Sequence, residues 1–207
     1  MQKRSQTRRI PMKLLAKSLR KQFLAHDMKL PLERVYTRTT DMLSEYPHAS
    51  RALRKHLLDI LPCIAFYEEL IQKEGSREKA FALCKEWSLS EMEKTAKALQ
   101  NLMKVPGMYR LAPKIFDILI DQMYGVEAGF ISKKVDKQQG FARDTIICPY
   151  LSACKKYGSP ELTQLFCDVD DICYGDLHPK LVWARTKTMG RGGDCCDFRL
   201  YIDESRG

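Results

Sequence analysis

Apolar residues in the first 124 positions recur every three or four residues, the spacing of one face of an α-helix. The first such stripe consists of Ile10, Leu14, Leu15, Leu19 and Phe23. A longer helix is predicted from about Pro47 to Lys73, with a kink at Pro62 and an end at Gly75.

Three more features continue this helical pattern. Ser76 is a suitable cap for a helix that pairs with the long one, and Ser90 with Glu93 forms a capping box before another. Pro106-Gly107 breaks the chain. A last apolar helix follows, with its stripe at Leu111, Ile115, Phe116, Leu119 and Met123.

The periodicity changes after Gly125. Residues 128–136 and 141–147 are short runs typical of a β-hairpin, and Leu181 to Thr188 and Cys196 to Ile202 are predicted strands. Short helices are expected after Pro149 and Pro160. Helices first and strands later predict an α+β fold, with an N-terminal helical bundle packed on a C-terminal antiparallel β-sheet with short helices.

Charge and cysteine content divide the chain further. Residues 1–26 hold eight Lys or Arg and no acid, whereas the remaining residues hold 27 bases and 26 acids. We therefore separate a basic segment, 1–26, from a helical region, 27–125, and a Cys-rich α+β region, 126–207, that forms one compact domain with the helices. A basic terminal run is usually a solvated tail or helix face, so no specific nucleic-acid binding is expected.

The basic start is not followed by the apolar stretch of a signal peptide, and the longest uncharged apolar run, Ile60 to Tyr67, is too short to span a bilayer. We expect a cytoplasmic protein without a membrane partner. Its cysteines should then be reduced thiols.

Six of the eight cysteines lie in the last 60 residues: Cys148, Cys154, Cys167, Cys173, Cys195 and Cys196. The gaps within the first two pairs are longer than the two to four residues typical of a zinc knuckle. We therefore expect no metal or cofactor, and keep zinc or iron as the alternative.

Two of these thiols have surroundings suited to chemistry. Cys148 precedes a Pro-initiated helix, whose N–H groups and dipole stabilise a thiolate. Cys196 follows the loop Gly190–Gly193 and stands between Asp194 and Asp197, near Arg185 and Arg191. A nucleophile, an acid or base and an anion-binding loop could meet there, although a plain hairpin turn with solvated charges explains the pattern as well.

Other candidates are Asp170 and His178. Asp168, Asp170 and Asp171 follow Cys167 at spacings that cannot all face one way on a helix. His178 is the only histidine of the C-terminal half.

Several short motifs together resemble one family. They are Cys148-Pro-Tyr, Pro160-Glu-Leu, Phe166-Cys167 with Asp170, Arg185-Thr186, and Gly193-Asp194-x-Cys196-Asp197-Phe198, with Leu61-Pro62-Cys-Ile-Ala-Phe-Tyr67 further upstream. The series resembles the L-2-amino-thiazoline-4-carboxylic acid hydrolase family, which has many bacterial members, over roughly residues 40–202. The resemblance implies hydrolytic opening of a cyclic amidine that carries a carboxylate.

The leading hypothesis is a hydrolase of non-peptide C–N bonds acting on a small thiazoline carboxylate-like ring. Its candidate catalytic residues are Cys196 or Cys148 as nucleophile, with Asp194, Asp197 or Asp170 moving the proton. Its candidate substrate-binding residues are Arg185, which suits a carboxylate because its guanidinium forms two hydrogen bonds, together with Cys167, Arg191, Gly193 and His178.

Two alternatives stay open. One is a non-hydrolytic metal- or cofactor-binding domain that uses the cysteine cluster, because the layout also resembles sensor domains of the 4-vinyl reductase type. The other is an adaptor that binds a partner through its helical half. The expected partner is a small-molecule substrate, with a second copy of the chain considered as a homodimer.

Overall fold

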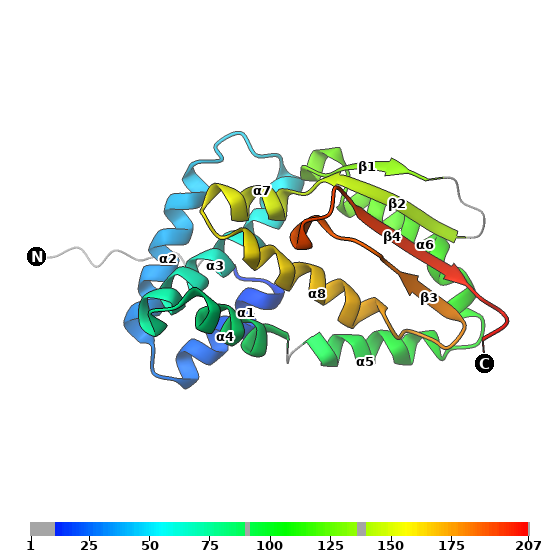
Figure 1. Ribbon diagram of the computed structural model, residues 1–207, viewed down its shortest axis with the longest axis horizontal. Helices are drawn as coiled ribbons and strands as arrows, with labels where there is room; N and C mark the ends of the chain where they lie inside the picture. Colours follow the sequence, from blue (N-terminus) through cyan, green and yellow to red (C-terminus); the bar gives the residue numbers. More distant parts are fainter. Residues whose placement is uncertain (1–10, 90–91, 136–139, 207) are drawn as a thin grey trace, which may run out of the picture.

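The computed structural model describes residues 11–89, 92–135 and 140–206. The α-helices are α1 (Leu14–Ala25), α2 (Lys29–Ser44), α3 (Arg51–Glu74), α4 (Arg77–Leu89), α5 (Met92–Met103), α6 (Met108–Met123), α7 (Pro149–Lys156) and α8 (Thr163–Tyr174). Three short 3₁₀ helices are η1 (Val126–Ala128), η2 (Pro160–Leu162) and η3 (Met189–Arg191). Figure 1 shows α1 to α4 gathered at one end, the sheet at the other, and α8 running between them.

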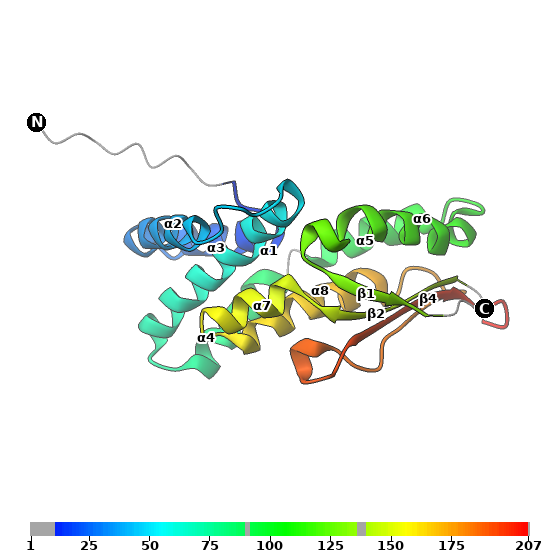
Figure 2. The same ribbon diagram turned by 90° about the horizontal axis from the view of Figure 1, so that it is seen from above.

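The sheet has the strands β1 (Ile131–Lys134), β2 (Gly140–Ile147), β3 (Leu181–Ala184) and β4 (Cys196–Ile202), in the order β1-β2-β4-β3. Every neighbouring pair is antiparallel. The fold is therefore α+β with an antiparallel sheet, as predicted. Figure 2 shows α5 and α6 along one face of this sheet.

Helix α3 is the centre of the helical end. It begins at Ser50, whose hydroxyl accepts the N–H of Leu53 at 2.9 Å, and ends at Gly75, which has a φ of 64° that suits glycine. Between Leu57 and Leu70 nearly every residue is buried, because α1, α2, α4 and α7 all pack on it. Pro62 lies inside this buried stretch.

Helix α6 has apolar side chains on two faces. Phe116 contacts Phe141 of β2 and Trp183 of β3, with ring centroids 4.8 and 5.8 Å apart. The opposite face leaves apolar side chains in solvent: Leu111, Ile115, Ile118, Leu119 and Met123. Most of the stripe that identified this helix in the sequence thus faces away from the protein.

The strands and helix caps predicted from the sequence agree with the structure in part. The hairpin and the strand Cys196–Ile202 are confirmed. The strand predicted from Leu181 to Thr188 is wrong beyond Ala184, because Asp197 accepts the N–H groups of Thr186 and Lys187 in place of a neighbouring strand. The capping box at Ser90 lies outside the described residues. The apolar pattern did not predict helix α2 as a separate helix.

Within the described part of the chain, no helix combines the length and the apolar character needed to cross a membrane.

Candidate active site

A cavity of about 150 Å³ lies between the sheet and the helices α6, α7 and α8, reaching α1 and α3 at its helical end. A cavity of this size holds a benzene-sized ring. Its wall is mostly aromatic and apolar, with a few polar groups. The lining residues that carry chemistry are Asp59, Tyr124, Arg143, Cys148, Tyr150, Thr163, Cys167, Asp170 and Cys196.

Three predicted thiols, Cys148, Cys167 and Cys196, come together at this cavity from different elements. Cys148 caps the N-terminus of α7, Cys167 lies on α8 and Cys196 opens β4. All eight cysteines of the chain are free. Burial raises the pKa of Cys148 to about 12 and that of Cys167 to about 11, so both are thiols at neutral pH.

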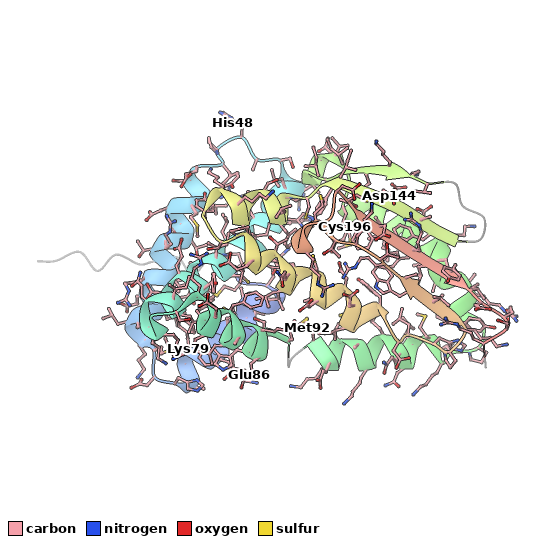
Figure 3. The ribbon with its side chains drawn as sticks, viewed as in Figure 1. His48, Lys79, Glu86, Met92, Asp144 and Cys196 are labelled. Atoms are coloured by element: carbon pink, nitrogen blue, oxygen red, sulfur yellow. The ribbon has the colours of Figure 1, made fainter. Side chains whose placement is uncertain are left out.

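Cys196 has both a hydrogen-bond donor and a cation close to its sulfur. Its Sγ accepts the backbone N–H of Met189 at 3.2 Å. Burial raises the pKa of Cys196, while that N–H and the nearby Arg185 guanidinium oppose the rise. Figure 3 shows Cys196 where the chain leaves the η3 loop and enters β4, beside α8. A hydrogen-bond donor and a cation are the groups that stabilise a thiolate.

Asp170 is a cavity-lining carboxyl whose charge acts on Cys196. It lines the cavity from α8, and burial raises its pKa to about 7, against the opposing charge of Arg185. A carboxyl with this pKa can both take and give a proton near neutral pH.

Arg185 is fully engaged by other protein groups. Its Nη1 lies 3.2 Å from Asp170 Oδ2, and its Nη2 lies 2.6 Å from Asp171 Oδ2 and 2.8 Å from the carbonyl oxygen of Cys167. Its side chain is 2% exposed and is not part of the cavity wall. The prediction that Arg185 binds a substrate carboxylate therefore does not fit the structure, because its donors already hold α8.

The two aspartates beside Cys196 also point away from the cavity. Asp197 accepts the N–H groups of Thr186 and Lys187 at 3.0 and 2.8 Å and the Thr186 hydroxyl at 2.5 Å. Burial opposes its ionisation, yet these donors hold its pKa below the usual value. Asp194 is exposed and pairs with Lys187. The structure gives both residues a role in the loop rather than at the cavity.

Three predicted substrate-binding residues lie elsewhere. Arg191 is exposed and pairs with the buried Asp168 of α8. Gly193 lies beside the carbonyl of Thr188 in the loop. His178 stacks on Tyr109, with centroids 4.1 Å apart, and accepts the N–H of Lys180 at the far end of β3. None of the three lines the cavity.

Sequence reasoning missed a polar group at the helical end of the cavity. Asp59 of α3 lines the wall, and Tyr150 of α7 lies between it and His56, with its hydroxyl 3.4 Å from Asp59 Oδ2 and 3.1 Å from His56 Nδ1. Arg143 of β2 was missed as well. Its guanidinium pairs with Asp117 and Asp121 of α6 at 2.7 and 2.8 Å. For Asp59, the signal in the sequence was a charged residue inside an otherwise apolar stretch of a helix.

Across residues 11–89, 92–135 and 140–206, no three His, Cys, Asp or Glu side chains are grouped so that they could hold a metal ion. The three thiols therefore share a cavity wall without forming a cage.

The sequence was compared with models of known protein families. The model of the family described as L-2-amino-thiazoline-4-carboxylic acid hydrolase matches residues 54–200, most of the chain. The chain belongs to this family. The range that matches the hydrolase family runs from α3 to β4 and includes every cavity-lining residue except Leu15 of α1. No curated protein and no solved structure matches the chain significantly.

Proposed function

We propose that the protein is a hydrolase that opens a cyclic amidine in a small ring carrying a carboxylate, with Cys196 as nucleophile and Asp170 as acid and base. The observation that carries the proposal is that Cys196, with an N–H donor on its sulfur, and Asp170, with a pKa of about 7, line the same ring-sized cavity. The name of the hydrolase family supports the substrate class.

The reaction proceeds in two steps. Asp170 takes the proton of the Cys196 thiol while the sulfur bonds to the amidine carbon, and the same proton then passes to the ring nitrogen as the C–N bond breaks. A water molecule next attacks that carbon, gives its proton to Asp170 and releases the sulfur, which recovers the proton. One water is added across one C–N bond, and the cysteine is regenerated.

Arg143 is the proposed partner of the substrate carboxylate, in place of Arg185. Among the described residues of the cavity wall, Arg143 is the only cationic side chain. It is 4% exposed, and its buried Nε has no hydrogen-bond partner among the described groups. A buried donor without a partner is costly, and a ligand oxygen would relieve that cost.

The test is ring opening of aminothiazoline carboxylate by the full chain, followed by chromatography of the product. Cys196→Ala should abolish turnover, whereas Cys148→Ala is the matched control because it removes a thiol from the same wall and should keep most of it. Full activity of Cys196→Ala, or the absence of ring opening by wild type, would contradict the proposal.

A further inference from the structure

Asp59 is a buried carboxyl with an unsatisfied oxygen at the cavity wall. It is 7% exposed, and its Oδ1 has no hydrogen-bond partner among the described residues. Burial raises its pKa to about 6, which the charge of Lys13 and the hydroxyl of Tyr150 oppose. A buried polar atom of this kind destabilises a protein unless a ligand satisfies it.

Tyr150, the hydrogen-bond donor of Asp59 among the described residues, is shared with a second acceptor, His56. His56 Nε2 lies 2.8 Å from the carbonyl oxygen of Met123, so Nε2 carries the proton. Burial lowers the pKa of His56, which keeps the ring neutral and leaves Nδ1 as an acceptor. The single phenol proton of Tyr150 can serve only one acceptor at a time, Asp59 Oδ2 at 3.4 Å or His56 Nδ1 at 3.1 Å. Among the described residues, Asp59 therefore has one long, shared hydrogen bond at Oδ2 and none at Oδ1.

Aromatic rings complete this end of the cavity. Tyr124, Phe130, Tyr150 and Phe166 all line it, and their ring centroids are 4.7 to 6.1 Å from one another along the series. Aromatic faces attract cations, and the attraction grows when water is excluded. The carboxyl and the rings thus favour the same kind of group, a positively charged nitrogen on a flat ligand.

We propose that Asp59 is the residue that selects the ligand by its protonated nitrogen, accepting N–H groups of an amidinium or amine held among these four rings. The assignment rests on the proposed function, because it concerns the same cavity. Amidines are basic and carry a proton at neutral pH, so they offer two N–H donors to one carboxylate. Such charge-assisted pairs are stronger than hydrogen bonds between neutral groups.

The test compares two probes of similar shape, aminothiazoline, which is cationic, and methylthiazoline, which lacks the amino donor. Calorimetric affinities are measured on the full chain carrying Cys196→Ala, so that turnover does not interfere. Asp59→Asn should weaken aminothiazoline binding roughly ten- to hundredfold and leave methylthiazoline binding within about twofold. Asp59→Leu, which is similarly branched but has no polar atoms, gives the same readout if the amide variant does not fold.

Asp144→Asn is the control, because Asp144 pairs with Arg199 on the other face of β2 and should not alter either affinity. Equal aminothiazoline binding with and without Asp59, or no binding at all, would overturn the assignment while ring opening by wild type still supported the hydrolase. Selective binding without any ring opening would support Asp59 and contradict the hydrolase.

Discussion

Asp170 and Arg185 form an ion pair in which the charge of Arg185 affects the pKa of Asp170. The carboxyl faces the cavity, whereas the guanidinium lies behind it and also bridges to Asp171 and to the backbone of α8. Burial raises the pKa of Asp170 to about 7, and the positive charge of Arg185 keeps it from rising further. Arg185 is therefore a positioning residue that acts through Asp170.

The raised pKa of Asp170 should make the rate of ring opening depend on pH near 7. If the ionised form of Asp170 is the base, kcat/KM should rise with pH through about 7, and Asp170→Asn should lower it by about 10²–10⁴-fold and remove that rise. The measurement is a pH profile of ring opening. An unchanged profile for Asp170→Asn would contradict the assignment.

The second prediction concerns Arg185. Removing its charge in Arg185→Gln raises the pKa of Asp170, so the rising limb of the profile should move to higher pH. Arg185→Lys, which restores the charge, should move it back toward the wild-type position. A loss of activity at all pH values without a shift would indicate a purely structural role.

The loop between β3 and β4 determines where Cys196 and its hydrogen-bond donor lie. Asp197 holds the N–H groups of Thr186 and Lys187 at its start. Gly190 allows a close approach to α8, because a Cβ there would lie 3.0 Å from Cys167 Sγ and 3.2 Å from Thr163 Cγ2. These contacts hold Met189 in place to donate to Cys196.

Asp197 and Asp194, two acids of the same loop region, provide a variant and its matched control. Asp197→Ala removes the acceptor of three donors, so it should lower the free energy of unfolding by about 1–2 kcal/mol and reduce turnover. Asp194→Ala removes only an exposed ion pair with Lys187 and should change neither. Urea unfolding measures the change in stability of both variants, and initial rates of ring opening measure the change in turnover. Equal effects would show that the loop is not held through Asp197.

The features of the site that depend on neighbouring residues in the chain could be predicted from the sequence. Cys196–Ile202 alternates clearly enough to show its exact bounds, and Cys148 was recognisable before a proline-initiated helix. The contact between Asp59 and Tyr150 joins residues 91 positions apart, and no local pattern reports such a pairing. For Asp197 the sequence did carry a warning, because adjacent residues of a strand face opposite sides and β4 opens at Cys196.

For the whole molecule, the α+β class followed from the order of periodicities, helical first and alternating later. What the order could not show is that the cavity forms where the two halves meet, with walls from α3, α6, α8 and the sheet. Placing two carboxyls in that apolar interior costs stability once they ionise.

The consequence is a pH dependence of unfolding that can be measured. The pKa of Asp170 is raised in the folded state, so the folded protein binds the proton more tightly than the unfolded chain, and stability falls as pH rises from about 4 to about 7. The difference between wild type and Asp170→Asn should therefore grow with pH up to about 7 and then stay constant. A pH-independent difference would contradict the raised pKa.

The burial that raises the pKa of Cys148, Cys167 and Cys196 has one more effect, on the chemical durability of the protein. Peroxide attacks thiolates and reacts slowly with protonated thiols. If Cys196 loses its proton to Asp170 only during turnover, as proposed, its sulfur is protected between turnovers. Many cysteine enzymes keep a standing thiolate and are readily oxidised for it. In the proposed mechanism, the resting nucleophile is therefore less reactive than a standing thiolate and less easily oxidised.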